Sequence, residues 1–138
     1  MDPGLDLDKR KPVIVVDDED VILDLIGTFL TMNGFTDIRK ASNGQKAWIT
    51  ILNCNPCLVI TDIDMPIMDG LQLIKQIRKK HRFIDVPILA LTANKETDKV
   101  IQILRSGVDG YLIKEALKED ELIYRIADAV IKRREKAL

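Results

Sequence analysis

Short apolar runs alternate with segments of helical periodicity along most of the chain, and this alternation limits the fold more than any other feature. Four runs are strongly apolar and one is more polar, and each precedes a segment whose apolar residues recur every three or four positions. Repeated strand–helix units favour a parallel sheet with right-handed crossovers and helices on both faces. The sequence therefore predicts an α/β fold with a doubly wound, five-stranded parallel sheet and five helices.

The bounds of the expected elements follow from these runs and from the turn residues between them. Strands are expected at 13–16, 37–41, 58–61, 88–91 and 111–113. Helices are expected at 21–32, 45–53, 71–81 and 95–106, with a last amphipathic helix that includes 122–131. The second strand is the most polar, so it is expected at an edge of the sheet. A chain of 138 residues suits one domain, which we place at 12–138 after a polar N-terminal extension at 1–11.

Composition argues against several classes of function. The 21 Lys and Arg residues are balanced by 22 Asp and Glu residues, so there is no excess of positive charge to neutralise a nucleic-acid backbone. No apolar stretch reaches the roughly 18 residues that a membrane helix needs. The polar start of the chain lacks the apolar run of a signal peptide. We expect a cytoplasmic protein that binds neither nucleic acid nor membrane directly.

Four of the expected strands end in side chains that can take part in chemistry. The first ends in Asp17 and Asp18, the third in Asp62, the fourth in Thr92 and the fifth in Lys114. In open parallel sheets the ligand site lies beyond the carboxyl ends of the strands. These side chains are therefore expected to converge at one edge of the sheet.

Three carboxylates at one edge repel one another and raise at least one pKa unless a cation lies between them. A hard, oxygen-preferring ion such as Mg²⁺ suits an all-carboxylate site that has neither His nor Cys. A lysine and a hydroxyl in the same cleft suit a phosphoryl group once it is attached to a carboxylate. The strand ends therefore indicate Mg²⁺ binding combined with phosphoryl chemistry.

Four segments at these strand ends resemble the receiver domain of two-component response regulators. They are VVDDE at 15–19, DIDMPIMDG at 62–70, LTA at 91–93 and GYLIK at 110–114. They occur in the order and with the spacing of that family, and the resemblance spans about residues 12–135. It implies a flavodoxin-like sheet with the strand order 2-1-3-4-5.

The resemblance implies a role for each carboxylate of the site. Asp62 resembles the phosphoacceptor, which takes a phosphoryl group from a phosphohistidine. Asp18 and Asp62 would bind Mg²⁺ through their carboxylates, Asp17 directly or through water, and Asp64 through its backbone carbonyl. The ion offsets charge on the transferring group, which is most of what phosphoryl transfer requires from a protein.

The resemblance also implies a switch and a set of partners. Lys114 would pair with one phosphoryl oxygen, Thr92 would move to hydrogen-bond another, and Tyr111 resembles the aromatic residue that then turns inward and alters a distant surface. The implied partners are a sensor histidine kinase or phosphotransfer protein and an output domain or downstream protein target, with a phosphorylation-dependent dimer as a further form. Such a domain is a signalling module that assists its own aspartyl phosphorylation and dephosphorylation, and it is not classed as an enzyme.

Simpler interpretations of the same side chains stay open. Asp17 and Asp18 precede a helical segment, so they also suit a helix N-cap. Thr92 is also consistent with an ordinary residue at a strand end, Lys114 with a solvated lysine, and Tyr111 with a half-buried aromatic residue. A structure decides among these interpretations by showing what each side chain contacts.

Three alternatives concern the protein as a whole. A phosphatase of the haloacid dehalogenase type also has an Asp-x-Asp pair after a strand, but Pro66 stands where its motif continues with Thr or Val. A flavodoxin-like FMN carrier needs a phosphate-binding loop after the first strand, where the acidic residues of this chain would repel phosphate. A degenerate receiver that no longer signals through phosphorylation is the third.

Cys54 and Cys57 have the spacing of a redox pair, but their surroundings favour packing. A reactive pair usually lies at the positive end of a helix, whereas here a helical segment ends before Cys54 and an apolar strand begins at Cys57. His81 is interpreted as a solvated cation at a helix end. The basic residues at 132–136 are interpreted as a solvated terminus or as the start of a connection to an output domain.

The fourth helical segment has more apolar residues than one buried stripe needs. They are Val100, Ile101, Ile103 and Leu104. Both deeper burial and a partner surface explain such a wide apolar arc.

The clearest departure from the family pattern is Glu115, where receivers usually have a proline joined by a cis peptide bond. A cis bond before a residue other than proline costs about 2.5 to 4 kcal/mol. We therefore expect a trans bond between Lys114 and Glu115 and a displaced loop before the last helix. Lys114 itself belongs to the preceding strand and is still expected to reach Asp62.

Overall fold

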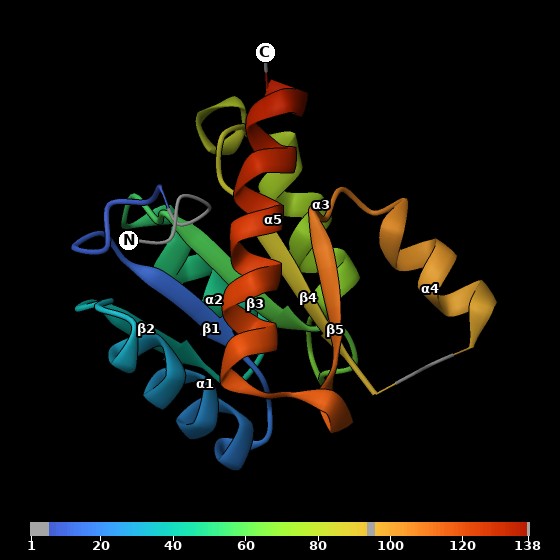
Figure 1. The fold of residues 1–138 in the computed structure, drawn as a ribbon. Helices are drawn as coiled ribbons and strands as arrows, with labels where there is room; N and C mark the ends of the chain where they lie inside the picture. The colour runs from blue at the N-terminus through green and yellow to red at the C-terminus, as the bar shows by residue number, and fades with distance from the viewer. Residues whose placement is uncertain (1–5, 94–95, 138) are drawn as a thin grey trace.

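The computed structural model describes residues 6–93 and 96–137, and a five-stranded parallel sheet lies at its centre (Figure 1). The strand order is β2-β1-β3-β4-β5, which confirms the expected order. The strands are β1 (Val13–Val16), β2 (Ile38–Ala41), β3 (Leu58–Asp62), β4 (Ile88–Thr92) and β5 (Gly110–Ile113). Strands β3 and β4 are each one residue longer than expected, so Asp62 and Thr92 belong to the strands themselves.

Five α-helices and two short 3₁₀ turns lie between or after the strands within the described residues. They are α1 (Asp20–Met32), α2 (Gly44–Leu52), α3 (Gly70–Lys79), η1 (His81–Phe83), α4 (Thr97–Leu104), η2 (Lys114–Ala116) and α5 (Glu119–Ala137). The expected third helix extends too far, because α3 ends at Lys79 and His81 begins η1. Lys95, the expected start of the fourth helix, lies outside the described residues. No described helix combines the length and hydropathy needed to cross a membrane.

The helices form two layers, one on each face of the sheet. Helices α1 and α5 pack on one face, where Ile26 and Ile126 are fully buried against the central strands. Helices α2 and α3 pack on the other face, where Ile51 and Ile74 are fully buried. Strands β1, β3 and β4 are buried along their whole length, as their continuous apolar sequences predict.

Helix α4 is packed less completely than the other helices of its layer and stands out at one side of the sheet (Figure 1). Its only buried residue is Ile103, whereas Ile101 is 40% and Leu104 51% exposed. The wide apolar arc of this segment is therefore only partly explained by burial.

The described part of the expected N-terminal extension, residues 6–11, lies against the domain. Leu7 packs on the α1–α5 side of the core. The Lys9 carbonyl accepts a hydrogen bond from the Thr36 backbone, and Arg134 of α5 forms an ion pair with Asp6 at 3.0 Å. Residues 1–5 lie outside the described residues, so the division between extension and domain stays a prediction.

Candidate functional site

Three carboxylates gather at the carboxyl edge of the sheet. Asp17 follows β1 directly, Asp18 is the next residue, and Asp62 ends β3. One carboxylate oxygen from each lies within 4.8 Å of the others. Asp17 and Asp62 are buried, whereas Asp18 is exposed. The sequence therefore predicted correctly which acidic residues converge.

Lys114 lies between the two buried carboxylates. Its ammonium nitrogen is 2.8 Å from Asp17 Oδ2 and 3.1 Å from Asp62 Oδ2, with Glu19 at 3.8 Å. The prediction that Lys114 reaches Asp62 is confirmed, and a lysine held this way is not a solvated one. The bond from Lys114 to Glu115 is trans, as expected. The displacement of the following loop stays a prediction.

Burial and charge crowding perturb the acid–base behaviour of the site. Burial, followed by the charge of Asp17, raises the pKa of Asp62 from 3.8 to about 6, although Lys114 opposes the shift. Burial also raises the pKa of Asp17 despite the nearby Lys114 ammonium. Burial alone would lower the pKa of Lys114, but its close contacts with the carboxylates of Asp17 and Asp62 outweigh burial and raise it. One lysine does not compensate the negative charge gathered here.

The donor set of this edge suits a hard divalent cation. Asp17 Oδ2 is buried and accepts no well-aligned hydrogen bond from the described residues, although Lys114 lies close to it. Asp17 Oδ1 accepts the Glu19 backbone N–H, and Asp62 Oδ1 accepts that of Ile63. All candidate ligands are oxygen atoms, as Mg²⁺ requires. The residues therefore fit the ion that the resemblance implies.

The loop from β3 to α3 is held tightly at both ends. Gly70 N–H donates to the Ile63 carbonyl at 2.9 Å, and a Cβ on Gly70 would lie 2.1 Å from the Asp62 carbonyl oxygen. Only glycine allows helix α3 to start this close to the acceptor strand. Asp69 caps the helix through a capping box with Gln72. This scaffold fixes the strand end that carries Asp62.

Asp64 lies at the start of that loop and points its side chain toward solvent. Its side chain is 68% exposed and lies 4.0 Å from Lys99 of α4. The proposed contribution of its backbone carbonyl to the metal stays a prediction.

Thr92 and Tyr111 lie on the same face of the sheet. In the parallel pairing, Tyr111 is the partner of Ala90 and Ile113 is the partner of Thr92. Side chains two residues apart on a strand share a face, so Tyr111 is a diagonal neighbour of Thr92. Thr92 is fully buried, and Tyr111 is half-buried against the core on the α2–α3 side. The arrangement suits both the switch and the plain aromatic interpretation.

The helix-cap interpretation of the first acidic pair is wrong. Helix α1 has Glu19 as its N-cap, and no side chain caps it. Asp17 accepts the N–H of Glu19, one residue before the helix, and its other oxygen contacts Lys114. Asp17 therefore belongs to the charge cluster.

The two cysteines are free thiols, and Cys57 is buried. Burial raises the pKa of Cys57 to about 11 and also raises that of Cys54. Thiols with raised pKa values are poor nucleophiles at neutral pH. The structure therefore supports packing for this pair.

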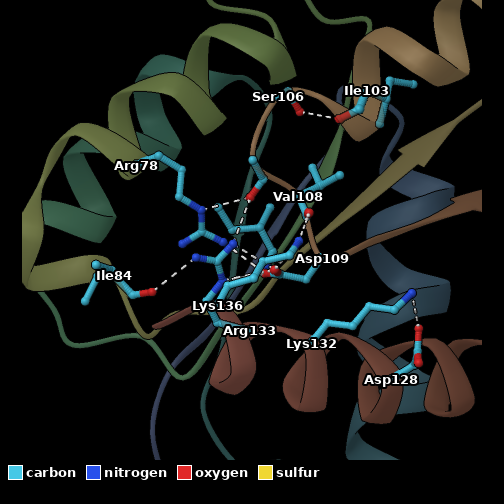
Figure 2. A network of polar contacts seen from close by, with 12 residues as sticks. Arg78, Ile84, Ile103, Ser106, Val108, Asp109, Asp128, Lys132, Arg133 and Lys136 are labelled. Atoms are coloured by element: carbon cyan, nitrogen blue, oxygen red, sulfur yellow. Dashed lines mark hydrogen bonds and ion pairs between the residues drawn. The ribbon is translucent and has the colours of Figure 1, made fainter. Parts of the chain in front are cut away.

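A second charged cluster lies at the opposite, amino edge of the sheet (Figure 2). Asp109, whose side chain is fully buried, lies just before β5 and is surrounded by Arg78 of α3 and by Arg133 and Lys136 of α5. Arg78 Nη2 donates to it at 2.9 Å and Arg133 Nε at 2.9 Å, and the Ile88 backbone N–H donates as well. The interpretation of 132–136 as solvated is wrong for Arg133, which is buried. This cluster links helices from both layers.

No sequence signal pointed to this amino-edge cluster. Its partners are 24 residues apart for Arg133 and Asp109 and 31 for Arg78 and Asp109. Basic residues at helix ends suit solvated cations equally well. Only the three-dimensional arrangement identifies the buried carboxylate as their common partner.

Comparison with known proteins supports the same family as the motifs. A model of the response regulator receiver domain matches residues 13–127. The chain is 35% identical over 103 residues to chemotaxis protein CheY1 of Helicobacter pylori strain J99, covering 74% of this chain and 83% of that protein. It is 34% identical over 123 residues to the phosphate regulon transcriptional regulatory protein PhoB of Pseudomonas aeruginosa, covering 89% of this chain and 52% of that protein.

Solved structures agree with these sequence relatives. The receiver domain of the Francisella response regulator 1452 superposes with a TM-score of 0.76 at 34% identity, covering 92% of this chain and 99% of that one. The phosphatase and FMN-carrier alternatives therefore lose their support. The degenerate-receiver alternative stays open, because family membership does not establish that Asp62 reacts.

Proposed function

The chain belongs to the response regulator receiver domain family, and we propose that it accepts a phosphoryl group on Asp62 from the phosphohistidine of a sensor kinase or phosphotransfer protein. The observation that carries the proposal is the state of Asp62. Its carboxylate is buried beside Asp17, and the pKa is raised to about 6. A bound cation stabilises the charged form of such a carboxylate, and Lys114 can pair with a phosphoryl group attached to it.

The reaction is a transfer between a nitrogen and an oxygen. An Asp62 carboxylate oxygen attacks phosphorus while the P–N bond to the donor imidazole breaks, and the imidazole nitrogen keeps the electron pair and is protonated. Asp17, Asp18 and Asp62, with the Asp64 carbonyl, would hold Mg²⁺, which offsets charge on the transferring oxygens. Lys114 then moves its ion pair from the carboxylates to a phosphoryl oxygen, and Thr92 donates to another.

The signal follows from the new contacts of Thr92. Its displacement frees space for Tyr111, a diagonal neighbour on the same sheet face. Two discrete positions of a half-buried aromatic couple the acceptor to a distant surface. We propose that this surface then contacts an output domain, a downstream protein or a second copy, within the cytoplasm.

Phosphorylation with a small donor tests the acceptor assignment. The protein is incubated with acetyl phosphate and Mg²⁺, and intact mass is measured with and without a chelator. We expect one added phosphoryl group that is lost in Asp62→Asn and in the chelated sample. Asp85→Asn, an exposed carboxylate remote from the site, serves as the matched control and keeps the label. Unchanged labelling of Asp62→Asn refutes the assignment, and no labelling at all favours a degenerate receiver.

A further inference from the structure

Ile67, in the loop between β3 and α3, combines two unfavourable features. Its φ angle is 71°, and it is the one described residue other than glycine with a positive φ. A β-branched residue in this conformation is a genuine outlier. Its side chain is also 76% exposed. Glycine or asparagine would suit the backbone, and a polar residue would suit the exposure, so folding does not explain an isoleucine here.

Ile67 borders a hollowed surface that runs across helix α3. One cavity of about 310 Å³ on this surface is lined by Ile67, Met68 and Lys79 among others. A second, of about 640 Å³, lies between α3 and α4 and is lined by Leu71, Ile101 and Arg105 among others. Lys75 of α3 lines both cavities, so the two are neighbours on this helix. We call the surface over these two neighbouring cavities the α3–α4 groove.

The apolar residues of the α3–α4 groove include part of the arc that burial did not explain. Ile101 belongs to that apolar arc and is 40% exposed. Met68 lines the smaller cavity and Leu71 the larger one, and both are half-buried. A hollowed surface with apolar residues along it is the form that receives an amphipathic helix.

The charged residues of the α3–α4 groove are mostly basic. Lys75, Lys79 and Arg105 are exposed, and Asp98 is the one acidic residue among those that line the two cavities. The protein as a whole has a net charge of −1, so this local excess is not a consequence of composition. A basic rim around apolar anchors is complementary to an acidic amphipathic partner.

We propose that the α3–α4 groove binds an acidic amphipathic helix of a partner protein. The apolar face of the helix covers Ile67, Leu71 and Ile101, and its carboxylates pair with Lys75, Lys79 and Arg105. Because the loop that carries Ile67 starts next to Asp62, the partner contacts the segment closest to the acceptor. The surface exists without phosphorylation, so the proposal does not rest on the acceptor assignment.

Binding of a designed peptide tests the proposal. The probe is a capped helical peptide of about 15 residues, with Leu on one face and Glu on the other, titrated into ¹⁵N-labelled protein carrying Asp62→Asn. We expect amide shifts confined to 64–79 and 97–106. A peptide with Lys in place of each Glu is expected to bind roughly tenfold more weakly, because attraction becomes repulsion. Equal binding of both peptides, shifts on another face or no binding overturns the proposal.

Matched variants test which residues contribute to peptide binding. Lys75→Glu is expected to weaken binding of the acidic peptide roughly tenfold, whereas Lys11→Glu, the same charge change at an exposed residue that lines neither cavity, leaves the affinity unchanged. Ile67→Asn is expected to weaken binding while it stabilises the fold. Ile131→Asn, the same substitution at an exposed residue of α5, leaves binding unchanged. A neutral effect of Lys75→Glu or Ile67→Asn contradicts the proposal, whatever the outcome of the phosphorylation experiment.

Discussion

The two edges of the sheet carry charged clusters that differ in the ratio of acidic to basic side chains. At the carboxyl edge, Asp17, Asp18 and Asp62 share one close lysine, Lys114. At the amino edge, the single carboxylate of Asp109 has three cationic neighbours (Figure 2). The carboxyl edge therefore has more acidic than basic side chains, and the amino edge has more basic than acidic ones.

The clusters also differ in how well their polar atoms are satisfied. Asp109 accepts hydrogen bonds from two arginines and a backbone N–H. Both arginines also donate to the Gly107 carbonyl, and Arg78 donates to that of Phe83. At the carboxyl edge, the pKa of Asp62 is raised and Asp17 Oδ2 lacks a well-aligned donor. A satisfied cluster stabilises the fold, whereas an unsatisfied one is ready for a ligand.

Breaking the amino-edge cluster should produce the largest loss of stability. Asp109→Asn leaves Arg78 and the buried Arg133 without the carboxylate that they share, and removing one member of a buried ion pair costs about 3 to 5 kcal/mol. We expect a loss of this size in the free energy of unfolding, measured by denaturant titration. Asp6→Asn is the matched control, because its exposed pair with Arg134 contributes at most about 1 kcal/mol. Equal losses for both variants would show that the amino-edge cluster is not a structural unit.

Mg²⁺ should stabilise the protein through the carboxyl edge alone. A ligand at about 100 times its Kd raises the free energy of unfolding by about 2.7 kcal/mol, because the ion relieves repulsion among the carboxylates. The thermal midpoint should therefore rise at millimolar Mg²⁺. The rise should shrink in Asp18→Asn, a variant that keeps both buried carboxylates. An unchanged midpoint for the wild-type protein counts against the metal site.

The raised pKa of Asp62 makes metal-free stability depend on pH. Because the folded-state value of about 6 exceeds the ordinary 3.8, the folded protein binds the proton more tightly, and stability falls as pH rises from about 4 to about 6. Asp62→Asn removes this loss. We expect the variant to gain about 1 to 2 kcal/mol over the wild type at pH 7.5 and much less at pH 4.5. Chemical unfolding with a chelator present measures both values, and a pH-independent difference would contradict the shift.

The smallest expected effect on stability is at Ile67, which belongs to neither cluster. Left-handed backbone costs a residue other than glycine about 1 to 2 kcal/mol, and asparagine tolerates it better. We expect Ile67→Asn to raise the free energy of unfolding by about 1 kcal/mol. Ile49→Asn is the control, since Ile49 is 55% exposed within regular helix α2 and gains nothing. A destabilised Ile67→Asn would mean that the loop is not strained.

The sequence predicted the carboxyl edge well because topology alone brings strand ends together. Once β1, β3, β4 and β5 were expected to be parallel, Asp62 and Lys114 had to meet at one edge. Periodicity also gave the helices to within a few residues, although it extended α3 into the turn at His81. The family pattern supplied the strand order and the proposed roles.

The amino edge could not be predicted in the same way. Its contacts depend on where α3 and α5 end relative to β5, and on long side chains whose direction no local pattern sets. Arg133 looked like any other cation in a basic helix end. The positive φ at Ile67 was equally hidden, because an isoleucine in sequence gives no sign of left-handed backbone.

The acid–base titration of Asp62 tests the contrast between the two edges most directly. The carboxyl ¹³C shift of Asp62 is followed from pH 3 to 9 in metal-free protein and again with Mg²⁺. We predict a midpoint near 6 without metal and a clear decrease when Mg²⁺ is added, because the cation favours the charged form. A midpoint near the ordinary 3.8 that does not respond to Mg²⁺ would contradict the account of the carboxyl edge as an unsatisfied, cation-binding site.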